Sequence, residues 1–169
     1  MNKQSEKTNA VRLAERQGIH FSLRSYTVDE DLSAAHAAER LGIDPDRVFK
    51  TIVVLGERKG AFVCIIPGSC EIDLKKAAAA MGDKSCALLP LKDLEALTGY
   101  QRGGCSPLGM KKKLPTFLDE TSSLFDWISV SAGRRGLQMI LSPADLISLS
   151  QASLADMIAP FVNNYTKNM

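Results

Sequence analysis

The chain has 169 residues with a formal net charge of +2, and 45% of its residues are hydrophobic while 24% are charged. This composition excludes an intrinsically disordered protein, and the length predicts one domain that buries its own core. The small net charge excludes indiscriminate binding of polyanions over the whole surface, so a nucleic-acid partner would have to meet a local basic patch such as 111–113 or 134–135.

The first part of the chain predicts two capped helices, one strand and a central hairpin. The helices follow the N-cap residues Thr8 and Ser33, and glycines at 18 and 42 end them. Alternating polarity over 19–26 predicts a half-buried strand between these helices. The remaining elements are a strand covered on both faces and its return strand, at 48–55 and 61–67. We expect this pair at the centre of the sheet.

The rest of the chain alternates helices and strands. The predicted elements are an alanine-rich helix after Asp73 or Ser69 that ends near Gly82, a strand at 87–89, a helix at 91–99, strands at 114–118, 127–131 and 137–141, a helix from Ser142 to Leu149, and a helical turn at Leu154, Met157 and Ile158. A glycine and proline loop follows Tyr100, and a turn at 132–136 joins the last two strands. The pattern predicts a mixed α/β domain over 1–169, with flexible ends at 1–9 and 163–169, whose sheet can close into a barrel.

Several kinds of site and location lack support in the sequence. The segment 1–9 has no apolar signal core, and no stretch approaches the roughly 18 to 20 apolar residues of a membrane span. The four cysteines form no CxxC pair and have no histidine nearby in sequence, so neither a zinc site nor a redox dithiol is indicated. We therefore expect a cytoplasmic protein with free thiols, no metal and no membrane partner.

Lys50 is the most informative residue, because it is the only charged position in the run 48–55. Burial of an unpaired ammonium group is costly. The lysine therefore either reaches solvent at a strand end or projects into a polar cavity that binds an anion or a carbonyl group. The pattern alone leaves both interpretations open.

Two loops could bring backbone groups and arginines to a ligand. Glycines in the segment 103–109 (GGCSPLG) would let backbone amides approach a ligand, although the loop alone is typical of a plain connector. The segment 131–136 (SAGRRG) ends a strand with a serine and turns through two arginines suited to phosphate, although a solvated hairpin is the commoner case. Neither segment matches a Walker loop or a Rossmann fingerprint.

Common hydrolase motifs have no support in the chain. There is no GxSxG elbow and no HExxH motif, and we interpret His20 and His36 as surface or capping residues. Cys105 could be a nucleophile, but no acid or base partner lies near it in sequence, which favours a small packed thiol.

Three motifs together resemble the YbaK/EbsC family in their order and spacing. They are FKT at 49–51, GGCSPLG at 103–109 and VSAGRRG at 130–136, and Tyr26 in the first strand also fits. The resemblance runs from about residue 10 to about residue 158. It departs from the family pattern at Cys105, where an aliphatic residue is usual, and at Ala132, where a second glycine is common.

The resemblance implies a mixed β-barrel flanked by helices, related to the editing domain inserted in bacterial prolyl-tRNA synthetases. It also implies a trans-editing hydrolase that deacylates misacylated proline tRNA, with Cys-tRNA(Pro) as the expected substrate and no cofactor. The residues that it implies in catalysis are Lys50, Gly103, Gly104 and Ser131. Those that it implies in substrate binding are Tyr26, Phe49, Thr51, Ser106, Pro107, Gly133 and Arg134.

In the mechanism that the family implies, Lys50 holds the 3′ end of the tRNA, while Gly103, Gly104 and Ser131 orient the aminoacyl ester. The thiol of the substrate cysteine then attacks its own ester carbonyl. A domain this small has little surface for reading a tRNA body, so we expect a transient complex with prolyl-tRNA synthetase. The alternatives are an Ala-tRNA(Pro) deacylase of the same fold and a non-catalytic module that binds a nucleotide or a tRNA end.

Overall fold

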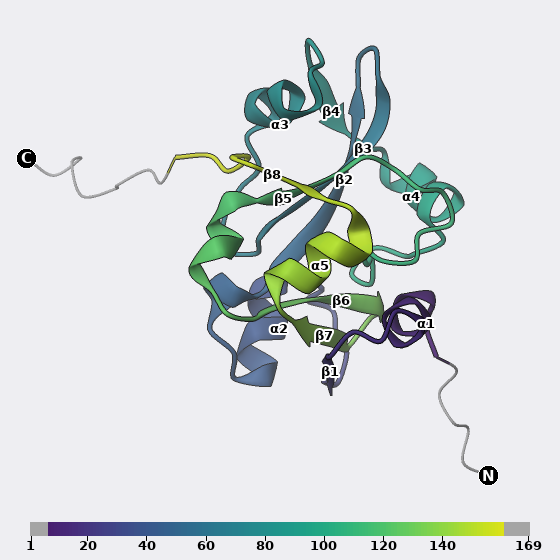
Figure 1. The fold of residues 1–169 in the computed structure, drawn as a ribbon, viewed down its shortest axis with the longest axis vertical. Coiled ribbons are helices and arrows are strands. Elements are labelled where there is room, and N and C mark those ends of the chain that lie inside the picture. The colour runs from purple at the N-terminus through teal and green to yellow at the C-terminus, as the bar shows by residue number, and fades with distance from the viewer. Residues whose placement is uncertain (1–6, 161–169) are drawn as a thin grey trace, which may run out of the picture.

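The computed structural model describes residues 7–160, in which five α-helices and two short 3-10 helices surround eight strands (Figure 1). The α-helices are α1 (Asn9–Arg16), α2 (Ala34–Leu41), α3 (Leu74–Met81), α4 (Leu91–Thr98) and α5 (Pro143–Ser150). The 3-10 helices are η1 (Pro45–Arg47) and η2 (Glu120–Leu124). The strands are β1 (Ser22–Ser25), β2 (Phe49–Gly56), β3 (Gly60–Pro67), β4 (Cys86–Leu88), β5 (Thr116–Asp119), β6 (Ile128–Arg134), β7 (Leu137–Leu141) and β8 (Ser153–Ala155).

Local sequence signals set the boundaries of most helices. The side chains of Thr8, Ser33, Asp73 and Ser142 each accept a hydrogen bond from a backbone N–H in the first turn of the helix that follows. These bonds satisfy amide groups that have no partner inside the helix. The capping residues predicted from the sequence are therefore confirmed, and Asp73 rather than Ser69 caps α3.

The strands form two sheets, one with the order β1-β7-β6 and the other with the order β4-β2-β3-β5-β8. The second sheet contains antiparallel and parallel pairs, so the expected mixed α/β domain is confirmed. The antiparallel pair of β2 and β3 lies inside this sheet, as predicted for the hairpin. An isolated parallel bridge between Val48 and Ser129 links the sheets within residues 7–160, so the barrel is joined there and open elsewhere.

Two hydrophobic cores lie on the two faces of β2. Phe49 and Val53 belong to a core between the sheets that also contains Ile128 and Met139. Val54, on the opposite face, belongs to a second core that includes Ala77 of α3 and Phe62. Because side chains alternate along a strand, Lys50 leaves β2 on the same face as Val54.

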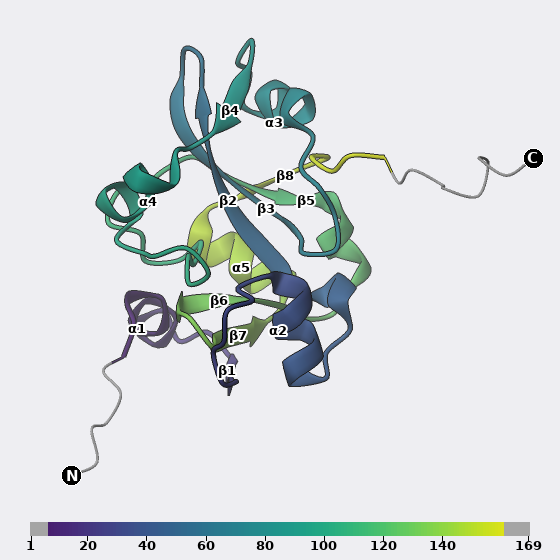
Figure 2. The same ribbon diagram turned by 180° about the vertical axis from the view of Figure 1, so that it is seen from behind.

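Helices cover both sides of the molecule. In Figure 1, α5 lies nearest the viewer, across the strands, while Figure 2 shows α2 on the opposite side beside the lower end of β2. The first turn of α2 comes close to the end of β3, because a Cβ atom on Gly68 would lie 2.4 Å from Ala34 Cβ. A glycine at 68 therefore allows α2 to approach the end of the β2–β3 hairpin, close to Lys50.

Two predictions about strands and turns were wrong in part. The predicted half-buried strand at 19–26 is only the four-residue β1, and all four of its residues are exposed because it is an edge strand paired with β7 alone. The predicted helical turn around Leu154 and Met157 is instead β8, which pairs in parallel with β5. The Met157 N–H donates to the buried Asp119 carboxylate at 2.9 Å, and this bond holds the segment extended.

Most of the segments predicted to be flexible, 1–6 and 163–169, lie outside the described residues. Residues 7–9 are described, and Asn9 begins α1. Among residues 7–160, none of the helices has the length and apolar character that crossing a bilayer requires.

Candidate active site

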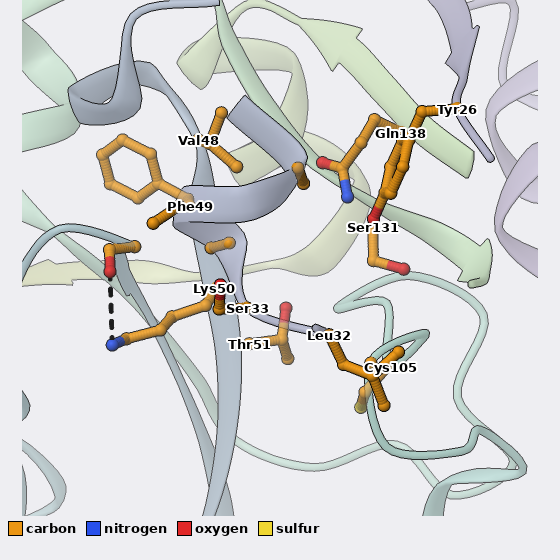
Figure 3. Close-up of a pocket in the computed structure, with 15 residues that line it drawn as sticks. Tyr26, Leu32, Ser33, Val48, Phe49, Lys50, Thr51, Cys105, Ser131 and Gln138 are labelled. Atoms are coloured by element: carbon orange, nitrogen blue, oxygen red, sulfur yellow. Dashed lines mark hydrogen bonds between the residues drawn. The ribbon is translucent and has the colours of Figure 1, made fainter. Parts of the chain in front are cut away.

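A hollow of about 300 Å³ lies between α2, the start of β2, the loop after Tyr100 and the β6–β7 hairpin. It brings together residues from segments that are far apart in the chain (Figure 3). Six of the eleven site residues expected from the sequence line it: Tyr26, Phe49, Lys50, Thr51, Gly103 and Ser131. We call this hollow the central pocket.

Lys50 carries the positive charge of the central pocket. Its Nζ lies 3.5 Å from the carbonyl oxygen of Gly68, and the side chain is half-buried. In Figure 3 the amine extends away from Ser131 and Cys105. Because one carbonyl contact leaves two of its three N–H donors for other partners, the ammonium group can bind an anionic or carbonyl oxygen at this end of the pocket.

Gly103 and Gly104 have different surroundings. Gly103 lines the pocket with a φ of +81°, and a Cβ atom there would lie 3.0 Å from Leu32 Cβ. Gly104 lies behind it, where a Cβ atom would come within 2.9 Å of the Arg135 amide nitrogen. The Gly104 N–H donates to the Gln101 carbonyl at 3.0 Å, so that amide is used within the loop.

Ser131 lies where the pairing of β6 with β7 becomes irregular. The register shifts between Ser131 and Arg134, which marks a bulge, and the Gly133 N–H donates to Ser131 Oγ at 3.2 Å. Bulges commonly redirect side chains near sites. Since this hydroxyl accepts from the bulge, its own hydrogen can be donated to a ligand in the pocket.

Tyr26, Phe49 and Thr51 are the other residues expected from the sequence that line the pocket. Burial raises the pKa of Tyr26, which keeps its phenol protonated and able to donate at neutral pH. Phe49 is only 2% exposed and forms part of the apolar floor. The Thr51 hydroxyl oxygen is buried without a hydrogen-bond partner among residues 7–160. Such groups are costly to leave unpaired, so the Thr51 hydroxyl is an unused hydrogen-bonding group in the wall of the pocket.

Besides Gly104, four expected residues do not line the central pocket. Ser106 is fully buried, and its Oγ accepts from the Leu108 N–H at 3.2 Å. Pro107 borders a separate hollow with Leu13. Gly133 packs on Tyr100, and it lines a separate hollow together with the exposed Arg134. These residues shape or flank the loops around the central pocket.

Comparison with known proteins identifies the family. The model of the aminoacyl-tRNA editing domain matches residues 30–149, a span that contains every residue lining the central pocket except Tyr26. The chain belongs to the aminoacyl-tRNA editing domain family. The resemblance to YbaK/EbsC proteins is thereby confirmed.

The editing domain has relatives that match over most of its length. It is 48% identical to EbsC of Enterococcus faecalis, provisionally named a Cys-tRNA(Pro)/Cys-tRNA(Cys) deacylase, over 91% of this chain and 94% of the relative. A proline–tRNA ligase of Shouchella clausii is 26% identical over 72% of this chain and 21% of the ligase. A crystal structure described provisionally as a trans-editing enzyme for prolyl-tRNA synthetase matches with a TM-score of 0.81 and 26% identity, over 92% of this chain and 100% of that one.

Cys105 of the editing domain lines the central pocket as a protonated thiol. Its surroundings are mainly apolar, and burial raises the pKa of the thiol to about 11. At neutral pH the nucleophilic thiolate is therefore a very small fraction. This agrees with the prediction of a packed thiol.

Among residues 7–160, no histidine lines the central pocket, and no metal-binding cluster is found. His20 is exposed, and His36 Nε2 lies 2.8 Å from an Asp29 carboxylate oxygen at the surface. Within residues 7–160, no group of three or more His, Cys, Asp or Glu side chains is placed to hold a metal ion.

Sequence reasoning missed several residues of the editing domain that line the pocket. Leu32 and its neighbour Ser33, the N-cap, directly precede α2, Gly68 follows β3, and Gln138 lies on β7. Gln138 could have been found, because a hairpin centred on 134–135 places it opposite Ser131. The other three depend on how α2 packs against the β2–β3 hairpin, which local sequence does not specify.

Proposed function

We propose that this editing domain is a trans-editing deacylase that hydrolyses the aminoacyl ester of Cys-tRNA(Pro). The observation that carries the proposal is the central pocket, where Lys50, Gly103, Ser131 and Tyr26 meet around a space of about 300 Å³. The 48% identity to EbsC, whose name refers to Cys-tRNA(Pro) and Cys-tRNA(Cys), supports this substrate class.

In the proposed mechanism each group supplies position or charge. Lys50 binds phosphate or sugar oxygens at the 3′ end of the tRNA, and Tyr26 and Thr51 add hydrogen bonds to the same nucleotide. Phe49 forms the apolar floor. The bare backbone of Gly103 and the Ser131 hydroxyl orient the ester, while Gly104 holds the loop in place. Ser106, Pro107, Gly133 and Arg134 are assigned to shaping the walls and to contacts with the flanking tRNA.

The substrate supplies the nucleophile in this proposal. The sulfur of its cysteine side chain attacks the ester carbonyl carbon, the bond from that carbon to the ribose oxygen breaks, and the thiol proton is transferred to the ribose oxygen. Water then hydrolyses the resulting thiolactone to free cysteine. The protonated state of the Cys105 thiol supports a mechanism without an enzyme nucleophile, and no cofactor takes part.

Deacylation of a panel of charged tRNAs tests the substrate. The panel contains Cys-, Ala-, Ser- and Pro-tRNA(Pro) together with Cys-tRNA(Cys). We expect Cys-tRNA(Pro) to be hydrolysed fastest and Ser-tRNA(Pro), which lacks the thiol, to be hydrolysed poorly. Faster hydrolysis of Ala-tRNA(Pro) would establish the alternative deacylase, and tight binding without hydrolysis of any ester would establish a non-catalytic module.

We assign selection of the proline tRNA to a transient complex with prolyl-tRNA synthetase. The net charge of +2 and the small surface of a 169-residue domain support this assignment, because the enzyme has little area for contacts to a tRNA body. The synthetase should be retained on the immobilised protein when tRNA(Pro) is present and lost when it is omitted. The proposal treats 1–169 as one editing domain that works in the cytoplasm.

A further inference from the structure

Gln138 and Ser131 face each other across the β6–β7 hairpin. The two residues are register partners in this antiparallel pair, so their side chains leave the sheet on the same face. Ser129 lies two residues before Ser131 on β6 and therefore shares that face. Both Ser131 and Gln138 line the central pocket. The hairpin thus places three polar side chains together at one wall of the pocket.

A buried hydrogen bond fixes the orientation of the Gln138 amide. Ser129 Oγ donates to Gln138 Oε1 at 2.8 Å, and the two residues are only 0% and 7% exposed. With Oε1 occupied, the Nε2 group is turned the other way, and Figure 3 shows it on the side of Ser131 and Tyr26. No hydrogen bond joins Nε2 to another group within residues 7–160. The amide therefore presents N–H donors toward the pocket.

Ester cleavage develops negative charge on the carbonyl oxygen as the carbon becomes tetrahedral. Fixed N–H and O–H donors directed at that oxygen stabilise the transition state more than the ground state. Ser131 keeps a hydroxyl hydrogen for donation, and Gln138 presents an amide N–H beside it. Adjacent donors on one rigid hairpin form the kind of arrangement that holds a single oxygen.

We propose that Gln138 Nε2 donates a hydrogen bond to the carbonyl oxygen of the aminoacyl ester, as the partner of Ser131 in an oxyanion site. Ser129 is then a positioning residue, because it fixes the amide without touching the substrate. The inference rests on the proposed function, since it requires an aminoacyl ester in the central pocket. The binding roles assigned above are thereby extended by one contact, made by Gln138, that stabilises the transition state.

Two variants of Gln138 distinguish two roles of its side chain. One role is to donate a hydrogen bond to the substrate, and the other is to accept the hydrogen bond from Ser129. Gln138→Glu keeps the length of the side chain and an acceptor for Ser129 but removes the N–H donors, whereas Gln138→Met removes both. For the full chain acting on Cys-tRNA(Pro), we expect kcat to fall about 10²-fold in both variants with little change in KM. Thermal unfolding of both variants checks that they remain folded.

Each other pattern of results overturns the inference. Wild-type kcat in Gln138→Glu with a loss in Gln138→Met would mean that Gln138 only supports Ser129. A loss in Gln138→Glu with wild-type kcat in Gln138→Met would mean that the new negative charge alone is harmful, and wild-type kcat in both would remove Gln138 from the reaction.

The pH profile of Gln138→Glu provides a second test, which remains available if Gln138→Met does not fold. A protonated carboxyl group donates an O–H, and burial favours that neutral form. We expect kcat of Gln138→Glu, relative to wild type, to recover as the pH falls from 8 to 5.5. A ratio that does not change with pH would overturn the inference.

Measurement of the wild-type protein in the same assay distinguishes failure of the proposed function from failure of the proposed role of Gln138. If wild type hydrolyses Cys-tRNA(Pro) while both variants match it, the proposed function stands and the role of Gln138 falls. If wild type hydrolyses only another ester of the panel, the substrate assignment fails and the variants are compared on that ester. If wild type hydrolyses no ester, both proposals fall.

Discussion

Leu32 packs against the bare Cα of Gly103, so that the loop between β1 and α2 meets the loop after Tyr100 at the edge of the central pocket. A Cβ atom on Gly103 would lie 3.0 to 3.3 Å from three Leu32 side-chain atoms. The contact joins segments that are about 70 residues apart in the sequence. It requires glycine both for space and for its φ of +81°.

Gly103→Ala should therefore disturb the pocket as well as the fold. A non-glycine residue in this backbone region costs roughly 1–2 kcal/mol, and Leu32 must also move. Gly60→Ala is the matched control, because Gly60 has a φ of +80° and nothing lies within 4 Å of its added Cβ. Both variants should lose about 1 kcal/mol or more of unfolding free energy in urea titrations. Only Gly103→Ala should lose deacylation, by about 10²-fold; equal activity of the two variants would contradict this role of Gly103.

Replacement of Cys105 by serine should leave substantial deacylation activity. The thiol lines the pocket, but burial raises its pKa to about 11 and it therefore remains protonated at neutral pH. A nucleophile of that kind would be inactive under assay conditions. Steady-state rates of Cys105→Ser on Cys-tRNA(Pro) should stay within about tenfold of wild type. Complete loss of activity in a variant that still folds would restore Cys105 as the nucleophile.

The raised pKa of Cys105 also makes the free energy of unfolding depend on pH in the alkaline range. The folded-state pKa of Cys105 is raised from 9.0 to about 11, so the folded protein binds more protons than the unfolded chain between these values. Its contribution to the unfolding free energy is complete below pH 9 and is lost as the pH rises toward 11. Urea titrations at pH 8, 9 and 10 should show falling stability, with a shallower fall in Cys105→Ser. Parallel pH dependences of wild type and variant would contradict the assignment.

Helix boundaries and the central hairpin could be predicted from the sequence because their signals are local. The Ser33 and Ser142 caps act within one turn, and the apolar run that forms β2 is buried on both faces. The edge strands β1 and β8 were predicted less well. Their conformation depends on pairing with β7 and β5, which lie more than 30 residues away.

Lys50 is the site residue that the sequence signals most directly, because it conflicts with its own surroundings. Lys50 is a lone charge in an apolar strand, and the structure places it in the central pocket. Ser106 and Pro107 belong to the same short motif as Gly103, but the turns of the loop direct them elsewhere. Gln138 gives no local signal, because its relation to Ser131 arises from strand register and its orientation from Ser129.

Single-turnover deacylation of Cys-tRNA(Pro) by Lys50→Ala tests the central claim most directly. Lys92→Ala is the control, because Lys92 is an exposed lysine on α4 that does not line the pocket. We predict that Lys50→Ala loses deacylation by about 10²-fold or more while unfolding like wild type, and that Lys92→Ala remains fully active. Wild-type turnover by Lys50→Ala would contradict the account, because the only charge assigned to the tRNA 3′ end would then have no part in the reaction.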